Sequence, residues 1–270
     1  MKDRYPKRIV CLTEEPTETL YLLGEQHRIA GITTFTVRPS QARKEKPVVS
    51  AFTSANIDKI LELKPDLVVG FSDIQAEIAA ALIKQGLEVH IFNHRSVEEI
   101  FNMIQQLGSL VGASEKASRF IGETEKNLDK IRLESQKLDP KPLVYFEEWY
   151  EPMITGIQWV TELIEIAGGI DCFPEHKNKP LAKDRIVRDP KTVIEKNPDI
   201  IIGSWCGRKF RSDKVIKREG WHSISAIQNN DLYEVDSSII LQPGPAALTD
   251  GVQELRMIIH EWSRRQNQVA

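Results

Sequence analysis

Short apolar runs rich in β-branched residues recur along the chain. They lie at 9–12, 29–32, 67–69, 89–92, 143–146, 200–202 and 233–235. Runs of this length between polar or turn-forming residues predict buried strands. Between several of them, apolar positions at helical spacing end at a glycine, as at Gly24, Gly86 and Gly108. This alternation of strand and helix predicts an α/β fold with doubly wound sheets.

One segment of this pattern occurs twice, about half a chain apart. Pro65–Gly70 reads PDLVVG, and Pro198–Gly203 reads PDIIIG. Each copy follows a short amphipathic segment that predicts a helix. A helix that leads into a buried β-branched strand is half of a βαβ unit. Two such units predict two similar α/β lobes, with a ligand cleft between them.

The stretch from Ser114 to Leu138 interrupts the alternation. It contains no proline, its apolar residues recur at helical spacing, and Ser114 is a favourable N-cap. A helix of about 25 residues would span about 37 Å, enough to bridge two lobes without a flexible hinge. We therefore predict an N-terminal lobe over 1–113, one long bridging helix over 114–139 and a C-terminal lobe over 140–270.

Charge and cysteine content narrow the function classes. The net charge of −3 gives no basic surface for nucleic acid, and no apolar run approaches the roughly 20 residues that span a bilayer. The apolar run that contains Cys11 is too short for a secretory signal, which predicts a first strand and a cytoplasmic protein. The cysteines Cys11, Cys172 and Cys206 cannot all pair, as expected in a reducing compartment. No phosphate-binding glycine loop and no zinc-type spacing occurs in the sequence.

Polar and aromatic residues gather just after the predicted strands. Ligands of parallel α/β sheets bind beyond the carboxyl ends of the strands. Aromatic rings are concentrated in these loops, and such rings suit a large, flat ligand. The candidate ligand-binding residues are Glu15, Phe35, Phe52, Thr53, Phe71, Glu148, Trp149, Arg185, Trp205, Cys206 and Gln242.

Each candidate also has a plainer interpretation. An aromatic ring after a strand packs in the core about as often as it lines a rim. Glu15 and Glu148 could bind a cation or a ligand amide, or could be solvated or cap a helix. Cys206 could contact a ligand or act as a nucleophile, whereas a lone cysteine after a buried strand is usually a small apolar residue. A basic set leaves room for an anionic ligand or forms a solvated face. It comprises Lys183, Arg185, Arg188, Arg208 and Lys209.

Together these features resemble the helical-backbone (class III, cluster A-II) substrate-binding proteins of ABC importers, nearest to the vitamin B12-binding members. The resemblance is carried by Arg8–Val10 with Leu22–Gly24, Ile57–Gly70, Ile164–Gly169, Pro198–Gly203 and Asp236–Asp250. It implies two α/β lobes joined by one rigid helix. It also implies a non-catalytic binding protein for a corrinoid, haem or ferric siderophore, with no cofactor or metal of its own.

The resemblance further implies roles for single positions. Phe71 follows the strand where B12 binders place a pocket tryptophan, and Glu77 occupies the place of a transporter-docking glutamate. A second docking glutamate falls at Lys191, and a second pocket tryptophan falls at Arg185. The charge reversal at Lys191 predicts that the chain does not dock productively on a B12 importer.

Three functions remain open on the sequence alone. The first is a cytoplasmic binding protein for a cobalamin-like corrinoid or another metal chelate, separate from any ABC permease. The second is the periplasmic component of a B12 or ferric-siderophore importer, which has an ABC permease as its partner. The third is an enzyme that acts on a metal chelate through Cys206 and Glu148.

Overall fold

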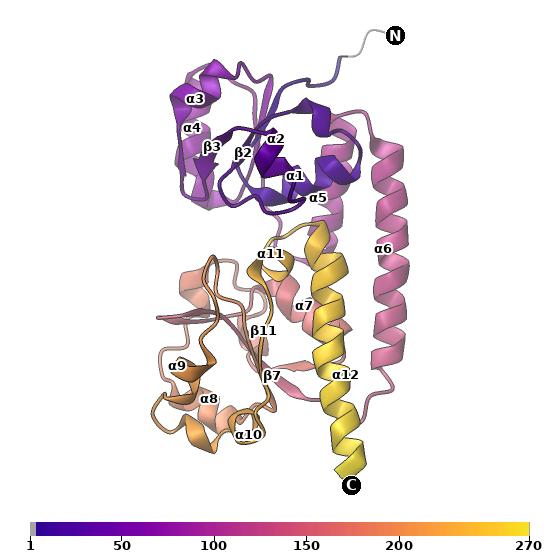
Figure 1. Ribbon diagram of the computed structural model, residues 1–270, viewed down its shortest axis with the longest axis vertical. Coiled ribbons are helices and arrows are strands. Elements are labelled where there is room, and N and C mark those ends of the chain that lie inside the picture. The colour runs from indigo at the N-terminus through magenta and orange to yellow at the C-terminus, as the bar shows by residue number, and fades with distance from the viewer. Residues whose placement is uncertain (1–3, 270) are drawn as a thin grey trace. The chain divides into compact units, whose positions relative to one another are not determined.

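A computed structural model describes residues 4–269, and the chain forms two units (Figure 1). Unit 1 comprises residues 4–94, Glu98–Glu123 and Pro243–Pro245, and unit 2 comprises Arg95–Val97, Thr124–Gln242 and residues 246–269. Helix α6 (Ser114–Ser135) contributes residues to both units. Residues that are distant in the chain can belong to the same unit. In unit 1, the carbonyl oxygen of Pro243 lies 2.7 Å from Nε2 of His94.

Unit 1 is built on a six-stranded sheet in the order β4-β3-β2-β1-β5-β6. Its strands are β1 (Ile9–Cys11), β2 (Ile29–Thr33), β3 (Val48–Ala51), β4 (Ser54–Ala55), β5 (Leu67–Phe71) and β6 (Val89–Phe92). All neighbours pair in parallel except β3 and β4, which pair in antiparallel. The apolar runs therefore form strands as predicted, and the sheet reverses its winding at β1.

Helices surround this sheet and bury its apolar side chains. They are α1 (Glu14–Leu22), α2 (Ala42–Glu45), α3 (Ile57–Glu62), α4 (Ala76–Lys84) and α5 (Val97–Leu110), together with the first part of α6. One core cluster joins Val10 and Val68 of the central strands with Ile60 of α3 and Leu82 of α4. Helices α3 and α4 thus turn their apolar faces to the sheet, as their spacing predicts.

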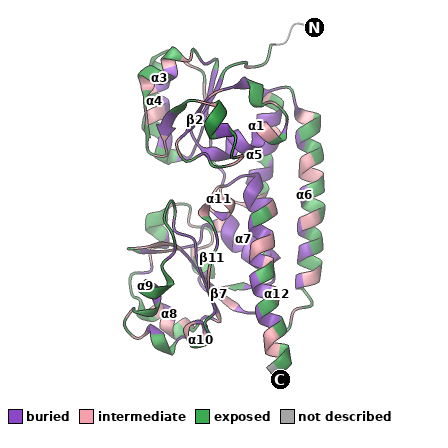
Figure 2. Ribbon diagram, viewed as in Figure 1, coloured by how far each residue is buried: buried purple, intermediate pink, exposed green. Residues whose placement is uncertain are grey.

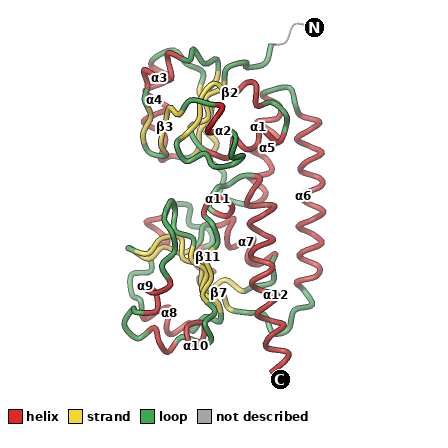
Figure 3. Tube along the Cα trace, viewed as in Figure 1, coloured by secondary structure: helices red, strands yellow, loops and turns green. Residues whose placement is uncertain are grey.

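Unit 2 is built on a five-stranded sheet in the order β11-β10-β7-β8, with β9 also paired to β7. Its strands are β7 (Leu143–Tyr150), β8 (Met153–Thr155), β9 (Ile170–Asp171), β10 (Ile200–Gly203) and β11 (Leu232–Glu234), and Figure 3 shows the strands of both sheets in yellow. Strand β10 is parallel to both β7 and β11, as in the β1-β5-β6 part of unit 1. The prediction of two α/β lobes is confirmed by these two sheets.

The end of β7 differs from the sequence prediction. The apolar run ends at residue 146 and predicts a loop after it, but residues 147–150 continue the strand because β8 pairs with them in antiparallel. Trp149 lies opposite Ile154, and Tyr150 lies opposite Met153. The polar and aromatic run resembles a loop in sequence, yet β8 supplies its backbone hydrogen-bond partners.

The helices that lie wholly in unit 2 are short, apart from the last. They are α7 (Gln158–Ile166), α8 (Lys191–Lys196), α9 (Ser212–Ile216), α10 (Ser225–Gln228), α11 (Ser237–Ile240) and α12 (Val252–Val269). Figure 2 shows that α12 carries buried and exposed positions along its length. Leu255, Ile259 and Trp262 form its buried stripe, as the spacing of three and four residues predicts.

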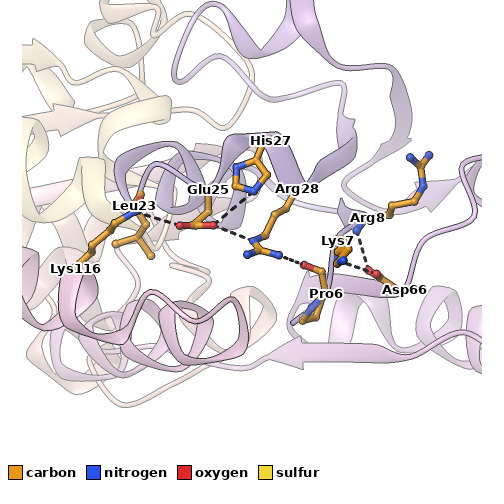
Figure 4. Close-up of polar contacts among 9 residues, drawn as sticks. All are labelled: Pro6, Lys7, Arg8, Leu23, Glu25, His27, Arg28, Asp66 and Lys116. Carbon is orange, nitrogen blue, oxygen red and sulfur yellow. Dashed lines mark hydrogen bonds and ion pairs between the residues drawn. The ribbon is translucent and has the colours of Figure 1, made fainter. Parts of the chain in front are cut away.

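The repeated Pro-Asp sequence directly precedes β5 in unit 1 and β10 in unit 2. Lys64 and Asn197 precede the two copies, and both have a left-handed backbone with φ of 47°. The carboxylate of Asp66 accepts hydrogen bonds from the backbone N–H groups of Lys7 and Arg8, as Figure 4 shows. In the second copy, Asp199 accepts from the backbone N–H of Leu143 at 2.8 Å. The repeat therefore fixes the start of β1 and of β7 in the same way.

A second polar group holds the segment before β1. Glu25 accepts hydrogen bonds from Arg28 at 2.9 Å and Lys116 at 3.2 Å (Figure 4). Arg28 also donates to the carbonyl of Pro6 at 2.7 Å. Burial opposes ionisation of Glu25, but the hydrogen bonds from Arg28 and Lys116 outweigh it and lower its pKa.

Candidate functional site

A pocket in unit 2 lies at the carboxyl ends of β10 and β11. Its volume is about 560 Å³, within the range of small-molecule sites. It is lined by Trp205, Gly207, Arg208, Lys209, Glu234, Val235, Asp236, Ser237 and Glu254. Most of these residues directly follow the two strands, which end at Gly203 and Glu234. This is where parallel α/β sheets place their ligands.

A series of aromatic rings connects this pocket to the end of β7. Ring centroids are 5.3 Å apart for Trp149 and Tyr150, 4.6 Å for Tyr150 and Trp205, and 5.1 Å for Trp205 and Phe210. The exposed Arg208 lies 5.5 Å over the ring of Trp149 and donates to the Tyr150 hydroxyl at 3.2 Å. We call these five residues the aromatic cluster. Rings beside an exposed guanidinium can hold a planar ligand that carries negative charge.

Trp205 forms the buried part of the aromatic cluster. Its side chain is 2% exposed, and its Nε1 donates to Glu147 at 3.1 Å. Glu147 is fully buried and accepts from Arg218 at 2.5 and 3.0 Å and from the Tyr145 hydroxyl at 3.0 Å. A buried ion pair therefore holds the indole in the core of unit 2, whereas Trp149 is only partly buried. Neither Glu147 nor Arg218 is among the candidates that the sequence indicates, because no local spacing links residues so far apart.

Glu148 and Arg185 form an ion pair with each other. The Arg185 side chain is 1% exposed, and its Nη1 lies 2.6 Å from Oε2 of Glu148. Its Nη2 donates to Oε1 of the same carboxylate at 3.3 Å, and Nη1 also donates to the carbonyl of Thr155. Both residues were candidates for ligand contact, and the structure places them in an ion pair that joins β7 to the segment before α8.

The side chain of Gln75 forms hydrogen bonds at the carboxyl ends of β1, β3 and β5 in unit 1. Its Oε1 accepts from the backbone N–H of Phe71 at 2.9 Å. Its Nε2 donates to the carbonyl of Phe52 at 3.0 Å and to that of Leu12 at 3.3 Å. The candidates Phe52 and Phe71 are thus brought to one place, at the carboxyl ends of β3 and β5. Sequence analysis missed Gln75, which is fully buried despite its polar side chain.

Two buried carboxyl groups begin α1, directly after β1. Glu15 is 1% exposed and accepts from the Thr13 hydroxyl at 2.6 Å. Burial and the neighbouring Glu15 raise the pKa of Glu14 to about 8. Burial also raises the pKa of Glu15 to about 7, although the hydrogen bond from Thr13 opposes the shift. Gly244 lies so close that a Cβ there would stand 2.6 Å from the Cβ of Glu15.

The remaining candidates lie at the surface or at an intermediate depth. Phe35 is 42% exposed, and Thr53, Cys206 and the first-turn Glu77 of α4 are also exposed, while Gln242 is partly buried. The structure therefore sorts the candidates into two sets. Unit 1 carries Glu15, Phe35, Phe52, Thr53, Phe71 and Glu77, and unit 2 carries Glu148, Trp149, Arg185, Trp205, Cys206 and Gln242.

Residues 4–269 contain neither a metal-ion site of clustered side chains nor a membrane-spanning helix. Within that range, no group of three or more histidine, cysteine, aspartate or glutamate side chains has a geometry that could hold a metal ion. Over the same residues, no helix combines the length and the apolar character that crossing a membrane requires.

Comparison with known proteins gives consistent matches over most of the chain. The model of the family described as "Periplasmic binding protein" matches residues 9–239. The chain is 28% identical to the uncharacterized ABC transporter substrate-binding lipoprotein YvrC of Bacillus subtilis, covering 94% of this chain and 80% of that protein. It is 25% identical to the vitamin B12-binding protein of Vibrio cholerae, covering 92% and 87%. A solved structure of a possible iron-binding (periplasmic solute-binding) protein from Staphylococcus epidermidis superposes with a TM-score of 0.79 at 26% identity, covering 95% and 99%.

The prediction of a cytoplasmic protein is wrong. The matching proteins are periplasmic binding proteins or a substrate-binding lipoprotein, which work outside the cytoplasm. The cysteine argument also fails, because Cys11 and Cys172 are enclosed in the cores of different units. Burial raises the pKa of both thiols to about 12, so their reduced state does not report the compartment.

Proposed function

The chain belongs to the periplasmic binding protein family, and we propose that it is the extracytoplasmic component of an ABC importer that binds a corrinoid or another metal chelate. Members of the family bind small molecules for an ABC permease and are not enzymes. This favours the importer interpretation over a separate carrier and over an enzyme that uses Cys206. The ligand class is the part of the proposal that goes beyond the family.

The aromatic cluster beside the pocket of unit 2 is the observation that carries this ligand class. Trp149 and Tyr150 are only partly buried, so their rings can contact a ligand, whereas Trp205 supports them from the core. Corrinoids, haem and many ferric chelates offer large conjugated or flat surfaces that gain from contact with such rings. Arg208 would add a donor for a carboxylate or phosphate on the same ligand.

The names of two similar proteins support the same ligand class. One relative binds vitamin B12, and one solved structure is described as a possible iron-binding protein. Metal chelates need no metal-ligating side chains from the protein, because the chelator already coordinates the metal. The aromatic cluster supplies rings and a guanidinium beside a pocket whose lining contains no histidine or cysteine, which agrees with that chemistry.

Titration with three chelates tests the proposal. Cyanocobalamin, haemin and a ferric hydroxamate siderophore should be added separately while absorbance and tryptophan fluorescence are recorded. We expect one of them to bind with quenching, since all five tryptophans lie in unit 2. Trp149→Ala should weaken binding by about 1–3 kcal/mol, or about 5-fold to 150-fold, through loss of ring contact.

A matched pair of arginines provides the control. Arg208→Ala should weaken binding, whereas Arg211→Ala should not, because the exposed Arg211 is paired with Asp213 and is absent from the pocket lining. The absence of binding by all three chelates, or equal effects of the two substitutions, would refute the proposed ligand class.

A further inference from the structure

A second pocket in unit 2 lies within the segment between β9 and α8. Its volume is about 440 Å³, and it is lined by His176, Asn178, Lys179, Pro180, Lys183, Asp184, Ile186 and Arg188. It shares no lining residue with the pocket beside the aromatic cluster. A ligand bound here would therefore be additional to the chelate.

The segment that forms this pocket is held in place from several sides. The backbone N–H of Val187 donates to the carbonyl of Met153 in β8 at 2.9 Å, and Ile186 bridges to Ile154 of the same strand. The buried ion pair of Arg185 with Glu148 fixes the segment to β7. A segment anchored in this way can present side chains in a defined arrangement.

Positive charge in the pocket is not compensated. The lining holds three cations, Lys179, Lys183 and Arg188, against one carboxylate, Asp184. Among residues 4–269, none of these three cations lies within 4.0 Å of a carboxylate. The other cations of the segment are neutralised, because Lys177 pairs with Glu165 at 2.6 Å as Arg185 does with Glu148.

His176 adds a hydrogen-bonding group of fixed orientation. Its ring stacks on Phe173 with centroids 5.4 Å apart, and its Nδ1 lies 3.0 Å from the Thr155 hydroxyl. Nε2 is the ring nitrogen for which the described residues provide no partner. The guanidinium of Arg188 and the ammonium groups of Lys179 and Lys183 are donors suited to an oxyanion with several acceptor oxygens. Nε2 of His176 is a further donor in the tautomer in which Nδ1 accepts from the Thr155 hydroxyl.

We infer that this pocket binds a phosphoryl group carried by a small molecule or by a lipid headgroup. Phosphate offers more acceptor oxygens and more charge than a carboxylate, which matches three uncompensated cations. The volume exceeds that of a bare phosphate ion and leaves room for an attached group. A small phosphoester and a lipid headgroup carry the same phosphoryl group, and binding experiments distinguish between them.

Binding should be measured with defined phosphate probes and with vesicles. Calorimetric titration with glycerol 3-phosphate tests a soluble phosphoester, and co-sedimentation with phosphatidylglycerol vesicles, against phosphatidylcholine vesicles, tests a lipid headgroup. We expect at least one probe to bind with an affinity that falls as salt is raised. Binding of the soluble probe assigns the pocket to a soluble phosphoester, and binding of anionic vesicles alone assigns it to a lipid headgroup.

Charge-reversal variants locate the effect. Lys183→Glu with Arg188→Glu should weaken binding by about tenfold or more, since two like charges then face the phosphoryl group. The control variant, Lys137→Glu with Lys141→Glu, makes the same net change at exposed lysines of unit 2 outside the pocket. All four positions are exposed, so folding should survive, and circular dichroism checks it. No binding of either probe, or equal loss in both variants, would overturn the inference.

Discussion

Replacing Arg218 with methionine should destabilise unit 2 far more than the same change at Arg211. Both arginines donate two hydrogen bonds to one carboxylate, Arg218 to Glu147 at 2.5 and 3.0 Å and Arg211 to Asp213 at 2.8 and 3.0 Å. The pairs differ in depth, because Glu147 is fully buried and Asp213 lies at the surface. Because the two pairs have similar hydrogen-bond geometry, comparing the two substitutions tests the effect of burial on stability.

The expected magnitude follows from what the substitution leaves behind. Without Arg218, Glu147 would keep the Tyr145 hydroxyl and the Trp205 indole as partners but would lose its cation. Removing one partner of a buried ion pair typically costs about 3–5 kcal/mol, because the other charge stays in a poorly solvated place. Exposed pairs often contribute nothing measurable, so Arg211→Met should leave stability unchanged. Methionine keeps an apolar side chain over the ring of Trp221, which Arg218 covers at 4.5 Å.

Urea denaturation followed by tryptophan fluorescence measures the difference. All five tryptophans belong to unit 2, so this signal reports the unit that contains both arginines. With a urea dependence of about 2–3 kcal/mol per molar, Arg218→Met should lower the midpoint by about 1–2.5 M. The double variant Glu147→Gln with Arg218→Met should recover part of the loss, since it removes the uncompensated charge.

Three results would refute this reasoning. A midpoint for Arg218→Met equal to that of the unchanged protein would mean that the buried pair is not needed for stability. Equal losses at Arg218 and Arg211 would mean that burial is not the deciding variable. A double variant less stable than Arg218→Met would place the effect in packing rather than in the unpaired carboxylate.

Two further predictions concern pH and close packing. The pKa values of Glu14 and Glu15 are raised to about 8 and 7, so at these two groups the folded state binds more protons than the unfolded state. Their contribution to the free energy of unfolding should be fully present below about pH 4.5 and should be lost, by a few kcal/mol, as the pH rises to about 9. Denaturation followed by circular dichroism should show this slope, and a slope unchanged by Glu14→Gln would contradict the assignment. Gly203→Ala would drive a Cβ into the ring of Phe210 and should cost about 1–3 kcal/mol by urea denaturation. Phe210→Leu in the same chain should restore part of that loss, and no rescue would argue against the steric cause.

The sequence by itself determined most of the secondary structure and the fold class. Each of the two Pro-Asp segments follows a residue with a left-handed backbone and leads into a buried β-branched strand. In each, the aspartate accepts a hydrogen bond from the backbone at the start of a neighbouring strand. These properties are local, because backbone preference and the alternation of apolar residues act over a few positions. For that reason the seven strands that coincide with apolar runs, the long helix α6 and the buried stripe of α12 could be predicted from residue spacing, whereas β4, β8, β9 and the end of β7 could not.

The tertiary structure alone decided which polar and aromatic residues are accessible. Trp149 and Trp205 look alike in the sequence, yet the indole of Trp205 is enclosed by its bond to Glu147. Arg185 looked like a ligand-binding cation and is instead buried against Glu148. Burial and polar pairing depend on contacts between segments that are distant along the chain, and the cost of an unpaired buried charge is set only when those segments meet. Local pattern therefore predicted where the strands lie, whereas long-range packing decided which side chains at their ends are free to meet a ligand.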